Sequence, residues 1–162
     1  MLTKFIGIDP GKQGSISVID LEGSLNVYPV PVVNDDYDLR AMYTLLIQNK
    51  EGAFAILERA QAMPGQGVSS MFNFGRGYGM WLMALSISEI PFQIVHPRVW
   101  TRIMLAGAEG EGKERSFSVA RQLFPQWNPK LKKEYQYSDS ILLAEYGRRL
   151  QTGGVDEGTK KD

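Results

Sequence analysis

The hydrophobic and polar positions of this 162-residue chain first follow a strand-like pattern. Short apolar runs separated by glycine-containing turns are typical of consecutive antiparallel strands. We therefore predict three such strands at the start of the chain, over residues 4–9, 14–20 and 25–30. Pro10-Gly11 ends the first run, and Glu22-Gly23 supplies the turn between the other two.

The rest of the chain predicts helices and two further strands. Apolar residues recur at helical spacing over 36–49, 113–123 and 138–150, and Pro97 is placed to open another helix. Continuous apolar runs over 53–57 and 92–96 predict buried strands, the first of them beside the strand at 4–9. This order predicts an α/β fold in which a mixed five-stranded sheet is flanked by helices.

The segment 63–79 is rich in glycine and aromatic residues, and we predict a loop there. An apolar helix follows, through Trp81, Leu82 and Leu85. This helix is apolar on more than one face, which suits either deep burial or a dimer interface.

Length and composition narrow the class of protein. A chain of this length predicts one domain, over 1–150, followed by a flexible tail over 151–162 with little to bury. The absence of cysteine excludes disulfides, thiolate catalysis, zinc fingers and iron–sulfur clusters. We find no export signal or membrane-spanning run, and we expect a cytoplasmic protein without a membrane partner.

Charge is segregated along the chain although the formal net charge is zero. Acidic residues are frequent in the first half, and basic residues gather between 95 and 133. The basic residues are Arg98, Arg102, Lys113, Arg115, Arg121, Lys130, Lys132 and Lys133. Such segregation can place a phosphate-binding face on a neutral protein. A solvated helical surface would give the same counts.

Acidic residues follow two of the predicted buried strands. Asp9 ends the run at 4–9 and Glu58 ends the run at 53–57, so both carboxylates should emerge at one edge of the sheet. Asp139, near the start of the last helix, could pack against that edge. Three clustered carboxylates repel one another unless a cation neutralises them, and Mg²⁺ or Mn²⁺ suits such ligands. Two ions held there would support phosphodiester hydrolysis.

Each acid also has a structural alternative. Asp9 could be a turn residue that bonds its own backbone. Asp139 could be a helix N-cap or a first-turn acid favoured by the helix dipole. Glu58 could form an ion pair, since Arg59 follows it directly.

Three motifs together resemble a known family. FIGIDPG (5–11), AILE (55–58) and SDSILLA (138–144) are similar, in order and spacing, to the acidic motifs of RuvC-type Holliday junction resolvases, particularly the phage-like branch. The resemblance implies a ribonuclease H-like fold, with Asp9, Glu58 and Asp139 as catalytic metal ligands. It also implies a homodimer that makes symmetric nicks in four-way DNA junctions, in a bacterial or phage-infected cell.

The chain departs from the family pattern at two positions. Gln136 stands where an acid or histidine is usual; it could ligate metal through its neutral carbonyl oxygen, or Glu134 could reach in. A lysine that opens the helix after the last strands is matched by Lys113, which the resemblance makes a catalytic residue. A second family lysine is absent near Thr101. The alternative is therefore a junction-binding protein with weak or lost cleavage.

Nucleic-acid contacts are predicted on two segments. Phe72 and Phe74 could stack on unpaired bases at the junction centre, with Arg76 beside them, or they could pack beneath the following helix. The predicted phosphate contacts are Arg98, Arg102, Lys113 and Arg115. His96 is more simply a hydrogen-bonded histidine than a catalytic base. An actin-like or sugar-kinase ATPase would need a second phosphate motif and a longer chain.

Overall fold

The computed structural model describes residues 1–61, 65 and 67–155. Its strands are β1 (Lys4–Ile8), β2 (Ser15–Asp20), β3 (Leu25–Pro29), β4 (Val32–Val33), β5 (Asp36–Tyr37), β6 (Ala53–Glu58) and β7 (Phe92–Val95). Its helices are α1 (Leu39–Gln48), α2 (Val68–Ile87), α3 (Pro97–Met104), α4 (Gly112–Leu123), the 3₁₀ helix η1 (Lys132–Tyr137) and α5 (Ser138–Gln151). None of the helices in the described ranges combines the length and the apolar character that crossing a bilayer requires.

The main sheet has five strands in the order β3-β2-β1-β6-β7. The first three pair antiparallel, whereas β6 runs parallel to β1 and to β7, which confirms the predicted mixed sheet. Ile8 lies opposite Leu57 in the parallel pair. Asp9 and Glu58 follow these two residues, so the register brings both acids to the same edge of the sheet.

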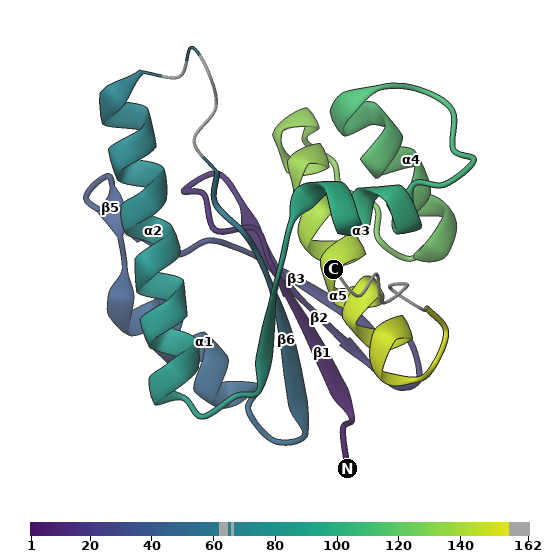
Figure 1. Ribbon diagram of the computed structural model, residues 1–162, viewed down its shortest axis with the longest axis horizontal. Helices are drawn as coiled ribbons and strands as arrows, with labels where there is room; N and C mark the ends of the chain where they lie inside the picture. The colour runs from purple at the N-terminus through teal and green to yellow at the C-terminus, as the bar shows by residue number, and fades with distance from the viewer. Residues whose placement is uncertain (62–64, 66, 156–162) are drawn as a thin grey trace, which may run out of the picture.

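Helices cover both faces of the sheet, with α1 and α2 on one side and α3, α4 and α5 on the other (Figure 1). Alternate residues of β6 point to opposite faces, as the pleat of a strand requires. Ala55 and Leu57 join a core with Trp81 of α2. Ile56 joins a second core with Leu142 of α5. The sheet is therefore buried on both faces, as its continuous apolar runs predict.

Helix α5 lies directly against the centre of the sheet. A Cβ at Gly7 of β1 would overlap the backbone of Ser140 and Ala144, so only glycine permits this approach. The buried Ser140 hydroxyl is hydrogen-bonded to the hydroxyls of Ser15 and Ser17, each at 2.6 Å. These contacts fix the first turn of α5, and with it Asp139, relative to β1.

Two predicted boundaries are wrong. The helix predicted over 36–49 begins at Leu39, because residues 36–37 pair with β4 and Asp38 caps the helix by accepting from the Ala41 N–H at 2.9 Å. The loop predicted over 63–79 is largely helix, since α2 begins at Val68. Its glycines do not break the helix, and a Cβ at Gly77 would overlap the Tyr37 ring.

The structure describes the first five residues of the predicted tail, 151–155. Helix α5 continues to Gln151, and Val155 is partly buried against the second core. The remainder of the predicted tail, 156–162, lies outside the described residues. Residues 62–64 and 66, in the predicted loop, lie outside them as well.

Candidate active site

The three predicted acids and Lys113 come together at one end of the sheet. Asp9 and Glu58 stand where β1 and β6 end, and Asp139 is the second residue of α5. Lys113 of α4 reaches across and forms an ion pair with the Oδ2 of Asp139. The site therefore draws on two strands and two helices, between α2 on one side and α3, α4 and α5 on the other (Figure 1).

The charge of Asp9 is costly in the folded protein. Burial raises the pKa of Asp9 to about 6, with Asp139 adding to the rise and Lys113 and the Gly11 backbone opposing it. The bond to Gly11 matches part of the turn role considered for Asp9. A turn role alone does not explain why the carboxylate lies within electrostatic reach of Asp139 and Lys113.

Glu58 is more strongly perturbed. Burial, followed by repulsion from Asp9 and Asp139, raises its pKa to about 8, and Lys113 opposes this rise. The Trp100 indole lies near enough to favour the ionised form, although its N–H completes no hydrogen bond among the described residues. The alternative of an ion pair with Arg59 is wrong, because within the described chain Glu58 has no such partner and Arg59 is exposed.

Asp139 is neither an N-cap nor a fully satisfied first-turn acid. Its Oδ2 is paired with Lys113, and its Oδ1 is buried without a hydrogen-bond partner in the described residues. Burial lowers the pKa of Lys113, but the neighbouring Asp139 outweighs burial and leaves that pKa raised. A buried carboxylate oxygen without a partner is expensive unless a cation or donor reaches it.

The acids fit a hard divalent cation in donor type, but they do not form a finished cage. No group of three acidic or histidine side chains in the described ranges is close enough to hold an ion as it stands. The free oxygen of Asp139 and the mutual repulsion of the acids are what Mg²⁺ or Mn²⁺ would relieve. Ion binding would require the acids to close together and Lys113 to release Asp139.

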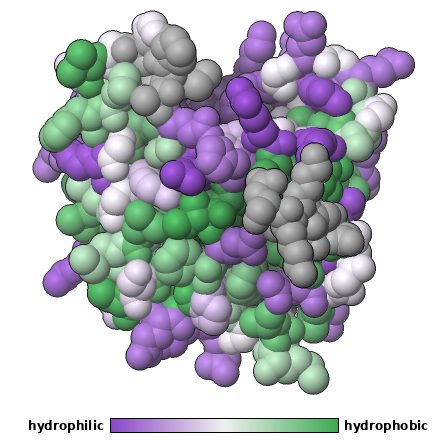
Figure 2. Space-filling view, viewed as in Figure 1, coloured by the Kyte–Doolittle hydropathy of each residue, from purple (hydrophilic) through white to green (hydrophobic). Residues whose placement is uncertain are grey.

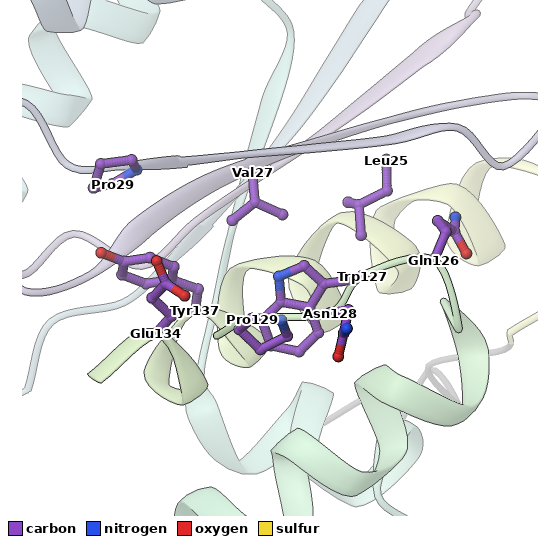
Figure 3. Close-up of a pocket in the computed structure, with 9 residues that line it drawn as sticks. All are labelled: Leu25, Val27, Pro29, Gln126, Trp127, Asn128, Pro129, Glu134 and Tyr137. Carbon is purple, nitrogen blue, oxygen red and sulfur yellow. The ribbon is translucent and has the colours of Figure 1, made fainter. Parts of the chain in front are cut away.

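The positions at which the sequence departs from the RuvC-type motifs do not bring a fourth acid to the site. Gln136 lies in η1 and lines a cavity with Lys113. Glu134 does not reach in, because its carboxylate accepts from the backbone N–H groups of Lys130 and Leu131 at 3.1 and 3.2 Å. It lies near Tyr137 in a separate cavity of about 360 Å³ under β3 (Figure 3). Thr101 donates to the Pro97 carbonyl within its own helix at 2.6 Å.

The basic residues predicted to contact phosphate on α3 and α4 differ in exposure and in whether they already have a partner. Arg98 and Arg102 are exposed on α3. Arg115 is partly buried, and its guanidinium donates to the Leu105 carbonyl, so it ties α4 to the end of α3. Hydrophilic side chains project over α3 and α4 in Figure 2. Among the four predicted contacts, as far as the structure describes the chain, Arg98 and Arg102 are therefore without an ion pair, whereas Lys113 is paired with Asp139 and Arg115 with the Leu105 carbonyl.

The aromatic residues predicted to stack on bases lie on a helix. One of them is exposed and could stack on a base, whereas the other is packed against the protein. Phe72 is 67% exposed near the start of α2. Phe74 is partly buried, close to Gly11 of the turn after Asp9. Arg76 forms an ion pair with Asp36. Phe72 is thus free to contact a ligand, whereas Phe74 packs against the site.

Two supporting residues have no signal in the sequence. Tyr37 donates from its hydroxyl to the Pro10 carbonyl at 3.3 Å, directly behind Asp9. Trp100 lies beside Glu58, in the helix that only Pro97 predicted. His96 is the N-cap residue of α3 and is hydrogen-bonded to Gln61 through Nδ1, which confirms the structural role predicted for it.

The sequence matches no family model and no curated protein. The structure is similar to two solved structures of RuvC from Thermus thermophilus. The first has a TM-score of 0.64 and 16% identity, over 93% of this chain and 96% of that chain. The second, RuvC in complex with a Holliday junction substrate, has a TM-score of 0.65 and 14% identity over the same shares. The chain therefore has a RuvC-like fold, with the mixed, helix-flanked sheet of the ribonuclease H type.

Proposed function

We propose that this chain is a divalent-metal-dependent endonuclease that cuts four-way DNA junctions, acting as a homodimer that makes symmetric nicks. The observation that supports this most is the electrostatically coupled set of Asp9, Glu58 and Asp139 at one edge of a RuvC-like sheet. Buried acids that raise one another's pKa are typical of functional sites. The motif resemblance favours the phage-like branch.

In this proposal Asp9, Glu58 and Asp139 hold Mg²⁺ or Mn²⁺, with Gln136 as a neutral ligand. When bound, the metal supplies the positive charge that activates water and stabilises the leaving oxygen of the phosphodiester. Asp9 and Glu58 are largely buried, which strengthens each electrostatic interaction between them. The Gly11 backbone hydrogen-bonds Asp9, and the Trp100 indole lies near Glu58.

Lys113 has two roles in succession. Without metal, its ammonium neutralises Asp139 and limits repulsion among the three acids. When the acids are occupied by metal, the same ammonium is free to bind a phosphate oxygen of the DNA. Its side chain is 56% exposed, so it can move without disrupting the core.

A nicking assay tests the proposal directly. Purified protein is incubated with a four-way junction, labelled on each strand in turn, in Mg²⁺ or Mn²⁺. We expect one nick in each of two opposing strands at symmetric positions, and Asp9→Asn should bind the junction without nicking it. Tight binding without nicks from the wild type would instead support the junction-binding alternative, for which Gln136 and the missing lysine at Thr101 are the motivation.

Phe72 is predicted to stack on an exposed base at the junction centre. Phe72→Ala should weaken junction affinity by about 10-fold or more, since one base–aromatic stack contributes roughly 1–3 kcal/mol. Binding is measured by fluorescence anisotropy in EDTA, for the junction and a linear duplex. Val68→Ala is the matched control, because Val68 is 85% exposed on the same helix and has no ring. Unchanged junction affinity in folded Phe72→Ala would remove this contact from the proposal.

A further inference from the structure

A second cavity opens beside the acids, between α4 and η1. Its volume is about 450 Å³. It is lined by Lys113, Glu114, Phe117, Lys132, Lys133, Tyr135 and Gln136. The two helices lie side by side at the end of the sheet where β1 and β6 finish (Figure 1). Since Lys113 lines the cavity and also pairs with Asp139, the cavity adjoins the candidate active site through this lysine.

The cavity has an excess of positive charge. Three lysines line it against one acid, Glu114. Lys132 and Lys133 are exposed, and in the part of the chain that the structure describes neither forms an ion pair. Adjacent lysines without acidic partners repel each other, and a bound anion relieves this repulsion. The charge therefore favours an anionic ligand.

One wall of the cavity is a fixed aromatic stack. The rings of Phe117 and Tyr135 are parallel, with centroids 3.9 Å apart and planes 16° apart. Phe117 also contacts Trp127, edge to face, with centroids 5.6 Å apart. A ring held in this way presents a flat apolar surface at little cost in side-chain entropy, which suits a sugar or a base. Proteins hold a nucleic-acid strand with cations that bind its phosphates and with aromatic rings that pack against its nucleotides, and this cavity has both.

We propose that this cavity binds one DNA strand next to the scissile phosphate. Lys132 and Lys133 contact a flanking phosphate, and the attached nucleotide packs against Tyr135. This inference rests on the proposed function, because it places the strand so that its next phosphate reaches Lys113 and the acids. Lys113 and Glu114 lie in the first turn of α4, so the cavity is next to the N-terminus of this helix. The partial positive charge of a helix N-terminus favours a bound phosphate.

The test removes the two lysines together. Lys132→Ala/Lys133→Ala should weaken binding to both the junction and a linear duplex by about 10-fold or more, and it should reduce the slope of log affinity against log salt by about 2. Affinity is measured by fluorescence anisotropy in EDTA at several salt concentrations, so that cleavage plays no part. Lys4→Ala/Lys50→Ala is the matched control, because it removes the same charge at the opposite end of β1 and β6.

The outcomes separate the two proposals. If the wild type binds DNA and the two double variants bind equally well, the cavity is not a strand site, whatever the nicking assay shows. If the Lys132/Lys133 variant alone loses affinity and salt slope, the cavity proposal holds even where the wild type nicks nothing or does not prefer the junction. Binding of a free mononucleotide that depends on these lysines, with unchanged DNA affinity, would identify a small-ligand site and overturn the inference.

Discussion

Glu58→Gln should reduce nicking by about 10³-fold or more and, at the same time, make the metal-free protein more stable at pH 8 and above. The loss follows from removing one charged oxygen ligand among three. The gain in stability follows from removing a buried carboxylate whose pKa lies at about 8 in the folded protein. A residue that only supported the fold would not produce opposite effects on activity and stability.

The direction of the pH dependence follows from proton binding. Folded Glu58 keeps its proton up to about pH 8, whereas the unfolded chain releases it near the ordinary pKa of 4.5. The native state thus binds more protons between these limits, and its free energy of unfolding falls as pH rises through them. A tenfold difference in proton affinity corresponds to about 1.4 kcal/mol. After discounting for the partial exposure of Glu58, we expect the free energy of unfolding of Glu58→Gln to exceed that of the wild type by on the order of 3 kcal/mol at pH 8.

Thermal unfolding in EDTA at pH 5 and pH 8.5 measures this effect. Wild type should lose stability between the two pH values, whereas Glu58→Gln should lose much less, keeping only the smaller fall due to Asp9, whose pKa rises from 3.8 to about 6 on folding. Glu89→Gln is the control, since Glu89 is exposed and paired with Lys50 at 2.8 Å. A Glu58→Gln protein with the wild-type pH dependence would show that Glu58 ionises normally.

Metal provides a second measurement on the same variant. Mg²⁺ binds only the folded site, so it should raise the unfolding temperature of the wild type at pH 8. It should have little effect on Glu58→Gln. Metal stabilisation that survives the substitution would place the ion away from Glu58.

The sheet and its acids were predictable because they depend on short-range patterns. An apolar run that ends in Asp9 or Glu58 defines both the strand and the point where the side chain emerges, and parallel neighbours then share an edge. Residues 68–79 were not predictable in the same way. Glycine normally argues against a helix, but at Gly77 the missing side chain makes room for the Tyr37 ring, a contact 40 residues away in sequence.

The details of the site depend on packing between elements that are distant in sequence. The pairing of Lys113 with Asp139 requires α4 to cross the start of α5, and no local pattern specifies that crossing. The aromatic wall of the second cavity likewise needs Phe117 and Tyr135 to meet from separate helices. Residue types therefore indicated which chemistry the chain could perform, whereas tertiary packing decided which charges remain free to perform it.

Gly7→Ala should destabilise the protein severely, by about 3–5 kcal/mol. The added Cβ would meet backbone atoms, which cannot rotate out of the way as a side chain can. The new Cβ would overlap the Ser140 oxygen and the Ala144 nitrogen, so α5 would have to move away from β1 as a unit. That movement would break the bonds from Ser140 to Ser15 and Ser17 and carry Asp139 away from Asp9.

Chemical denaturation measures the loss, with Gly75→Ala as the matched control. Gly75 lies exposed in α2 with nothing within 4 Å of the added carbon, so alanine there should be neutral or stabilise by up to about 1 kcal/mol. If Gly7→Ala remains folded, it should bind metal more weakly, because Asp139 would no longer lie beside Asp9 and Glu58. A Gly7→Ala protein as stable as Gly75→Ala would show that α5 does not rest on β1, and the convergence of the three acids would then lose its structural basis.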